Sequence, residues 1–415
     1  MAIPFSIEIE LPGGLGTDLP TEPIMWAITG FSMFYLLYNA YRMDFSMIRH
    51  PITLLLLLHL GWTGLTGITA VYPTYSIKFL LAKVWYVIPF FFFFTYVFQD
   101  KKSLTTFFKV LVGATLLSVT IVMIRHSASG FAFDTINKAS HPIYRNHVNY
   151  ACMLIAILPY VWYLWKIASR KWPYLLAMAY LVVAIYLSYC RAAILAIIIS
   201  IAMYYIVKWK LTRVAIATAL ISLAIAIPYF LSNGTYLDYA PDYEKTITHE
   251  KFDNLIEATY KLEDISTMER LYRWMAGKQM IEERPIFGFG PSNFFPNYEN
   301  HTISSFQTYV SNNPEKSGIH SYYLMISVEQ GIIGGLIFLF LVIVAFIYGE
   351  NIYHMLTDTH YKAVVMAAMM SLIAIASVLI INDLIEADKV GPFFFIACAI
   401  PIIGLMAKSR ENKLM

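Results

Sequence analysis

The stretch SGIHSYYLMISVEQGIIGG, residues 317–335, joins a long polar segment to an apolar run at 336–348. It places His320 at the start of this apolar region and Glu329 deeper within it. Insertion into a lipid bilayer requires an apolar segment but no imidazole at its threshold. The reason for the histidine must therefore be sought in the residues that surround it.

Composition identifies the class of protein. Of 415 residues, 58% are hydrophobic and 14% are charged, whereas a soluble protein carries about 25% charged residues. The chain is therefore predicted to be a membrane protein. The net charge of +3 is small, and no basic tract or zinc-knuckle spacing indicates nucleic-acid binding, so we expect no nucleic-acid partner. Cys152, Cys190 and Cys398 lie in or beside apolar runs and form neither a disulfide framework nor a metal site.

The fold class follows from the number of apolar runs, since a membrane-spanning helix needs about 20 mostly apolar residues. We predict an all-α, polytopic integral membrane protein with about 11 transmembrane helices and a large, partly helical outer loop. The predicted spans are 24–41, 52–71, 77–98, 104–124, 148–166, 173–190, 192–208, 213–231, 321–348, 363–382 and 391–407.

Orientation follows from Lys and Arg, which concentrate in cytoplasmic loops. The richer set of alternate loops includes Lys101 and Lys102, and Lys408 and Arg410 near the C-terminus. This predicts an outward N-terminus and an inward C-terminus. The chain then divides into an N-terminal transmembrane bundle (1–231), an outer loop domain (232–320) and C-terminal transmembrane helices (321–415).

Several polar residues collect on the predicted outer side. Arg191 stands between two apolar runs, where an arginine usually has a partner or a task; the simpler interpretation is an interfacial arginine that snorkels. Residues 268–298, MERLYRWMAGKQMIEERPIFGFGPSNFFPNY, add further arginines and a turn with two glycines. The simpler interpretation here is a solvated amphipathic helix followed by a turn. The arginines of this segment are Arg270, Arg273 and Arg284.

His320 is the side chain best suited to accept a proton near neutral pH. A structural histidine is the simpler alternative. Arginine forks bind phosphate oxygens, so a base and arginines at an outer membrane surface suggest transfer from a lipid-linked phosphate donor. A second polar cluster, Arg145 and His147 in HPIYRNHVNYA, precedes the fifth span.

The order of these parts resembles the O-antigen ligase and O-antigen polymerase superfamily of membrane glycosyltransferases. The resemblance covers roughly 191–334: Arg191 outside a middle span, R-x-x-x-W at Arg270 to Trp274 in a large loop, PIFGFGPSNF at 285–294, and H-S-x-x-L-x-x-x-x-E-x-G from His320. Each part is loose by itself, but the order and the topology together are specific.

The resemblance implies a glycan donor on undecaprenyl diphosphate at the periplasmic face of the bacterial inner membrane, with no metal, cofactor or nucleotide sugar. It implies that Arg191 and Arg270 bind the donor diphosphate and that His320 is the general base, or positions the acceptor hydroxyl, in an inverting displacement. Relatives have similar polar stretches near Arg145 and His147, which implies donor or acceptor contact there. The other accessory residues are Arg273, Arg284 and Glu329.

The acceptor is not determined by these motifs. A ligase uses lipid A–core and is our first prediction; a polymerase uses a second lipid-linked repeat, and a protein O-oligosaccharyltransferase uses a serine or threonine. A transporter is disfavoured because no paired interrupted spans occur, and a scaffold would not need these residues to converge. Family members usually have twelve spans with both termini inside, so residues 1–22 resemble the outer connection after a first span that is absent here.

Overall fold

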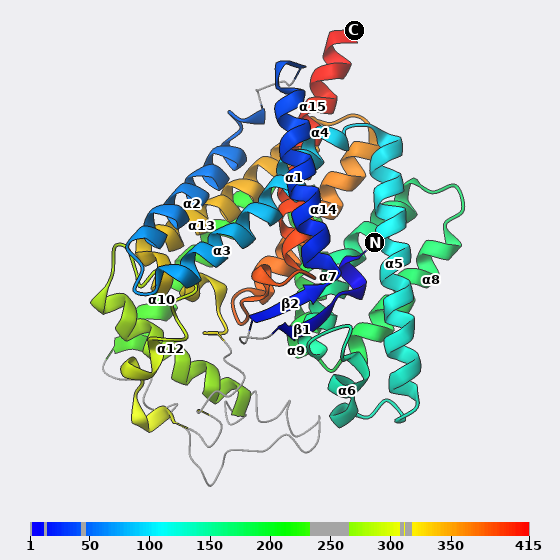
Figure 1. Cartoon of the computed structure of the whole chain (residues 1–415). Helices are drawn as coiled ribbons and strands as arrows, with labels where there is room; N and C mark the ends of the chain where they lie inside the picture. Colours follow the sequence, from blue (N-terminus) through cyan, green and yellow to red (C-terminus); the bar gives the residue numbers. More distant parts are fainter. Residues whose placement is uncertain are drawn as a thin grey trace.

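The chain folds as a bundle of long helices (Figure 1). This computed structural model describes residues 2–11, 15–42, 47–232, 265–307, 311 and 318–414. The helices are α1 (Thr21–Tyr38), α2 (Pro51–Ile68), α3 (Pro73–Val87), α4 (Phe94–Val97), α5 (Lys101–Ser127), α6 (Ile136–Ser140), α7 (His147–Ile167), α8 (Trp172–Tyr186), α9 (Arg191–Lys208), α10 (Thr212–Leu231), α12 (Ile265–Glu283), α13 (Tyr322–Met355), α14 (Thr359–Val378) and α15 (Gly391–Leu414).

The predicted class, a polytopic helical membrane protein, is confirmed. Within the described ranges, nine helical segments are long and apolar enough to cross a membrane: α2, α3 through α4, α5, α7, α9, α10, α13, α14 and α15. The other two predicted spans are the helices α1 and α8. With 15 residues, α8 is roughly 22 Å long, which is shorter than the ~30 Å hydrocarbon core. Helix α1 has 18 residues but is less apolar, with Glu22 and Pro23 in its first turn.

The helices alternate in direction, as predicted. Helices α6 and α12 lie at one end of the bundle and the C-terminus of α15 at the other (Figure 1). We call these the α12 end and the C-terminal end; the orientation predicts that the α12 end faces outward. Of the predicted loop domain 232–320, α12 confirms the expected helix, and residues 233–264, 308–310 and 312–317 lie outside the described part.

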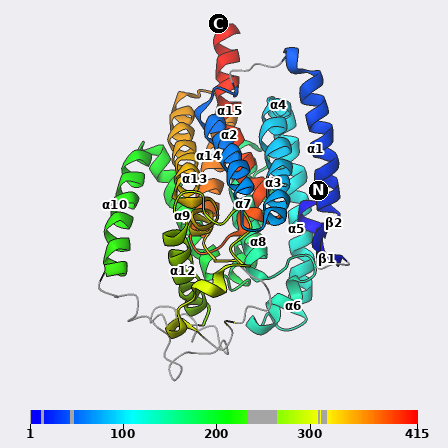
Figure 2. The same cartoon turned by 60° about the vertical axis from the view of Figure 1, so that its left-hand side comes forward.

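Helix α14 forms the centre of the bundle, packed against α7, α9 and α15. It is rich in alanine and methionine, and small residues let membrane helices approach closely. Two serines link the neighbouring helices: Ser371 Oγ donates to Ala156 O at 2.8 Å, and Ser200 Oγ donates to Met370 O at 3.0 Å. Helix α10 stands at one flank of the bundle (Figure 2), with most of its side chains exposed.

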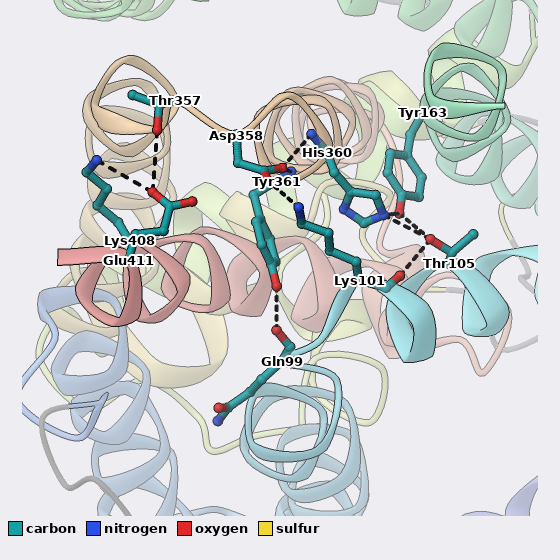
Figure 3. A network of polar contacts seen from close by, with 10 residues as sticks. All are labelled: Gln99, Lys101, Thr105, Tyr163, Thr357, Asp358, His360, Tyr361, Lys408 and Glu411. Atoms are coloured by element: carbon teal, nitrogen blue, oxygen red, sulfur yellow. Dashed lines mark hydrogen bonds and ion pairs between the residues drawn. The ribbon is translucent and has the colours of Figure 1, made fainter. Parts of the chain in front are cut away.

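A polar network ties helix ends together at the C-terminal end (Figure 3). Lys101 at the start of α5 forms an ion pair with Asp358, which also caps α14 through the N–H of His360 at 2.8 Å. The Nε2 atom of His360 lies 2.9 Å from both Thr105 Oγ1 and Tyr163 OH. Three helices, α5, α7 and α14, therefore meet at one set of contacts.

At the α12 end, the N-terminal residues dock onto the connection between α14 and α15. Strands β1 (Ile7–Leu11) and β2 (Leu15–Leu19) form an antiparallel hairpin in which Ile7 pairs with Leu19. Ser6, just before the hairpin, donates to Asp388. The buried Lys389 ammonium donates to the carbonyl of Ser6 at 3.1 Å. These contacts place the N-terminal segment at the predicted outer end.

Helix α13 is broken at Gly331, whose φ of 72° and ψ of 174° are not helical. The break frees backbone groups that lipid could not satisfy, and the segment after α12 satisfies them. The N–H of Phe289 donates to Val328 O at 3.1 Å, and that of Gly290 donates to Glu329 O at 2.8 Å. Beyond the break, the N–H of Ile332 donates to Pro285 O at 2.8 Å.

Side chains complete this junction. The Nε1 atom of Trp62 in α2 donates to Gln330 O at 2.8 Å. The buried carboxylate of Glu329 accepts the N–H groups of Ser292 at 2.8 Å and Phe294 at 3.1 Å. Residues 285–294, which we call the docking loop, are therefore held against α13 by both backbone and side chain. Glu329 is therefore buried and accepts hydrogen bonds from the docking loop.

Gly331→Ala is expected to detach the docking loop from α13. A Cβ at this position would lie 2.0 Å from Ile286 O, on a backbone at φ +72°. The backbone conformation at Gly331 is essentially restricted to glycine and costs a residue with a side chain about 1–3 kcal/mol. We expect a lower melting temperature and faster chymotrypsin cleavage after Phe287 or Phe289 in detergent micelles.

The control is Gly113→Ala in α5, where a Cβ would have no neighbour within 4 Å. This variant should match the wild type in both measurements, or melt slightly higher, since alanine favours a helix. Equal melting temperatures and cleavage rates in both variants would contradict the role given to the break.

Candidate active site

Helix α12 brings its charged residues to the α12 end of the bundle. Arg270 and Arg273 are three residues apart, so they share one side of the helix. Arg273 is buried and pairs with Glu269, at 3.4 Å between Nη2 and Oε2. The other carboxylate oxygen of Glu269 accepts from Ser311 Oγ at 2.8 Å. The predicted amphipathic helix is thus a buried element whose charges are fixed by neighbours.

The guanidinium of Arg270 links α12 to the end of α14. Its Nη1 donates to Ser266 Oγ at 2.7 Å and to Ser266 O at 3.1 Å. Its Nε lies 3.4 Å from Ile381 O. The adjacent Asn382 O accepts from the N–H of Tyr322, the first residue of α13, at 3.1 Å. Residues 379–383 therefore support both Arg270 and the start of α13.

His320 precedes α13 by two residues and has a left-handed backbone, with φ of 58°. Such a conformation is uncommon for residues with a side chain and persists where surrounding contacts hold it. Those contacts lie beside it: Arg273 Nη1 donates to Gly318 O at 3.3 Å, and Ile319 is buried. A Cβ at Gly318 would lie 2.0 Å from Asp383 Oδ2, so a larger residue there would require the Asp383 side chain to move.

The electrostatic surroundings of His320 are set by burial and by two arginines. Burial lowers the pKa of His320, and the positive charges of Arg273 and Arg270 lower it further, to about 3. His320 is therefore neutral at pH 7 and can accept a proton. Both guanidiniums are thus close enough to the imidazole to act on it electrostatically.

Arg191 joins the same region through the start of α9. It is the first residue of α9, after the buried Cys190. Burial raises the pKa of the Cys190 thiol, and the charges of Arg270 and Arg191 act against that rise. Arg191 and Arg270 thus act on one atom from two segments that are far apart in sequence. Arg191 and Arg270 therefore both lie within electrostatic reach of Cys190 at the α12 end, and their binding of a donor stays a prediction.

Asp383 is a partly buried acid near this site that the sequence analysis missed. Burial raises its pKa, and the charges of Arg273 and Arg145 oppose the rise. Arg145 therefore lies within electrostatic reach of the site, although its side chain is exposed. The signal was present in the sequence: Asp383, Glu386 and Asp388 interrupt an otherwise apolar C-terminal region.

The buried Lys83 of α3 contacts the connection between α14 and α15, which carries Asp383. Lys83 in α3 forms an ion pair with Glu386 and donates to Tyr322 OH at 2.7 Å. Tyr322 OH in turn donates to Glu386 Oε1 at 2.5 Å. Removing one partner of such a buried pair is strongly destabilising. Lys83 thereby holds together α3, the start of α13 beside His320, and the α14–α15 connection.

The remaining predicted accessory residues are engaged elsewhere. His147 begins α7, and its N–H and Nδ1 lie 2.9 and 2.8 Å from Asn137 Oδ1. Arg284 lies past the end of α12, where its guanidinium stands 4.8 Å from the Phe289 ring centroid. Arg270 and Arg284 are 14 residues apart, about 21 Å along a helix. Glu329 binds the docking loop, as described above.

The site therefore offers guanidinium groups that can bind an anion and a neutral imidazole that can accept a proton. Within the described ranges, His, Cys, Asp and Glu side chains form no group of three or more that could hold a metal ion. An anion that binds near Arg270 would also weaken the positive field at His320. This arrangement suits chemistry at an anionic leaving group next to a hydroxyl nucleophile.

Comparison with known families agrees with this arrangement. The sequence model of the O-antigen ligase family matches residues 176–339. The match begins in α8 and ends within α13, so it includes Arg191, α12, the docking loop, His320 and the break at Gly331. No curated protein matches the chain. The chain is thus a multi-pass membrane protein that carries an O-antigen ligase domain over residues 176–339.

Proposed function

We propose that this protein transfers a glycan from undecaprenyl diphosphate to an acceptor hydroxyl at the periplasmic face of the bacterial inner membrane, with lipid A–core as the acceptor. The observation that carries this proposal is the meeting of His320, Arg270 and Arg273 inside the region that matches the O-antigen ligase family. A hydroxyl nucleophile needs a base, and a diphosphate leaving group needs cations.

Arg191 and Arg270 are proposed to bind the diphosphate of the donor. Each guanidinium presents donors in a fork that fits phosphate oxygens in pairs. Both lie at the α12 end, beside Cys190. Arg273 is less available, because it is buried and already engaged with Glu269 and Gly318 O. Its proposed role is to position the segment that carries His320 and to contribute charge.

His320 is proposed to be the general base. The acceptor oxygen attacks the anomeric carbon, and a new C–O bond forms on the face opposite the diphosphate. The bond from the anomeric carbon to the diphosphate oxygen breaks, and its electron pair leaves on that oxygen. The acceptor proton passes to the imidazole and then to water, and undecaprenyl diphosphate is released. Direct displacement inverts the anomeric configuration, and the arginines supply the positive charge at the leaving group.

Donor binding would also change the basicity of His320. In the free protein, the charges of Arg273 and Arg270 contribute to the low pKa of about 3, at which an imidazole is a weak base. A bound diphosphate offsets positive charge near the imidazole, and a nearby negative charge raises a histidine pKa. His320 would therefore become a stronger base once the donor is in place.

The pH dependence of transfer should reflect this difference. Protonation of His320 removes the base, so activity should fall as the pH drops below the relevant pKa. The ratio kcat/KM for the donor reports the free enzyme and should stay level from pH 8 down to pH 5. The pH profile of kcat reports the donor complex. As the pH is lowered, kcat should therefore begin to fall at a higher pH than kcat/KM does.

His320→Ala is the matched variant for this measurement. Loss of a general base costs about 10²–10⁴-fold in rate, and the residual activity should no longer show the low-pH decline in kcat. The variant should still bind the donor, because both proposed diphosphate ligands remain. Wild-type rates in this variant would exclude His320 from the proposed proton transfer.

Arg191→Lys should separate a diphosphate ligand from an interfacial cation. Lysine keeps the charge but loses the paired donors, and hydrogen bonds to charged groups contribute about 1.5–3 kcal/mol. We expect kcat/KM for the donor to fall about 10- to 100-fold. Arg284→Lys, the control at the far end of α12, should stay within about twofold. Near wild-type transfer with lysine at position 191 would indicate an interfacial cation instead.

The acceptor can be identified by reconstitution with one purified undecaprenyl-diphosphate glycan. The possible acceptors are lipid A–core, a second donor molecule, and a periplasmic protein with accessible serines. The proposal predicts a single transfer to lipid A–core with release of undecaprenyl diphosphate. Growth of several repeats on the donor lipid, with lipid A–core unmodified, would identify a polymerase. Glycan on the protein alone would identify an oligosaccharyltransferase.

A further inference from the structure

A cavity of about 390 Å³ opens at the C-terminal end of the bundle, on the side of the molecule opposite the candidate active site. It lies between α5, the turn after α7, and the start of α8. Thr105 and Lys109 line it from α5, Ser169 and Arg170 from the turn, and Tyr174 from α8. Because Thr105 and Lys109 are four residues apart, they lie on the same face of α5.

The lining is cationic and contains no acid. Lys109 and Arg170 contribute two positive charges, and no Asp or Glu belongs to the cavity wall. Within the described residues, neither cation has an ion pair within 4.0 Å. The hydroxyl groups of Ser169 and Tyr174 add hydrogen-bond donors. Two cations and several hydroxyls around one cavity form a receptor for an anion with several oxygens.

The surroundings of the cavity are apolar and exposed. On α8, Trp172, Leu175 and Leu176 are exposed, and on α5 the side chains of Val110 and Leu117 are exposed. In a membrane these surfaces face acyl chains. A ligand that places an anionic group in the cavity and hydrocarbon along α5 and α8 would fit both features. Helix α8 is also too short to cross the bilayer fully, so headgroups can approach its first residue closely.

We propose that this cavity binds the phosphate of an anionic phospholipid of the cytoplasmic leaflet. The positive-inside pattern assigns this end of the bundle to the cytoplasm, and basic pockets between membrane helices on that side suit acidic headgroups. The shared chemistry is a phosphate ester held by Lys109 and Arg170. The inner wall of the cavity belongs to the network in Figure 3, since Thr105 Oγ1 also lies 2.9 Å from His360 Nε2. The lipid would thereby brace the α5–α7–α14 junction.

Lipid titration of the purified full-length protein, followed by native mass spectrometry, tests the proposal. The probes are phosphatidylglycerol and phosphatidylcholine with identical acyl chains. We expect tighter binding of phosphatidylglycerol and about a 30-fold loss of that affinity in Lys109→Gln/Arg170→Gln. Each cation lost near an anionic headgroup weakens binding about fivefold. Phosphatidylcholine binding should not change between the two proteins.

The matched control is Lys102→Gln/Lys166→Gln, which removes two exposed cations of the same end that do not line the cavity. It should keep wild-type affinity for phosphatidylglycerol. Equal losses in the two double variants would mean diffuse attraction to the surface and would overturn the site. Ser169→Trp keeps both cations but fills the cavity, so it should also weaken binding; wild-type affinity there would overturn the location.

A soluble anion is the other source of the same chemistry. Inorganic phosphate, added alone and in competition, distinguishes the two. The proposal predicts that phosphate displaces phosphatidylglycerol only at concentrations far above those at which the lipid binds. Displacement at equal concentrations, lost in Lys109→Gln/Arg170→Gln, would assign the cavity to soluble phosphate and overturn the lipid assignment.

Discussion

The break in α13 at Gly331 is the constraint on which the outer half of this structure depends. In a membrane environment, freed backbone groups need partners from the protein itself. Here the partners are the docking loop and Trp62, so the position of the loop is tied to the freed groups of α13. The loop directly follows α12, and α12 carries Arg270 and Arg273. The hydrogen bonds at Gly331 therefore also fix where the arginines stand.

The same junction explains why two glycine-bearing motifs occur in one chain. A Cβ at Gly288 would lie 2.5 Å from Val328 O and Glu329 C, so the docking loop can approach the broken helix only through glycine. Gly331 lies on the α13 side of the same interface, where a Cβ would lie 2.0 Å from Ile286 O of the docking loop. The two glycine-bearing motifs therefore contact each other. Glu329 adds a carboxylate for two further N–H groups, which explains an acid inside a span without giving it a catalytic task.

Charged side chains have different roles at the two ends of the bundle. At the α12 end, the charges of Arg270 and Arg273 act on the His320 imidazole, the charge of Arg273 acts on the partly buried Asp383, and the partly buried Glu386 forms an ion pair with Lys83. At the C-terminal end, Lys101 and Asp358 neutralise one another and join helix ends (Figure 3). In the proposed reaction the positive charge around His320 receives an anion, whereas the ion pair of Lys101 and Asp358 joins helix ends at the C-terminal end.

From the sequence alone, the membrane class, most of the spans and the resemblance of one region to the O-antigen ligase family could be predicted, because long apolar runs and motif order are local or sequential signals. The sequence also indicated Arg191, Arg270 and His320 as site candidates. It did not reveal the break at Gly331, the position of Asp383 near the site, or the hydrogen bond from Lys83 to Tyr322. It also treated Glu329 and Arg284 as parts of the site, whereas Glu329 binds the docking loop and Arg284 lies at the far end of α12. These features depend on which residues from distant segments meet, and only the packing of α3, α12, α13 and the α14–α15 connection decides whether a charge is paired, buried or left to act on His320.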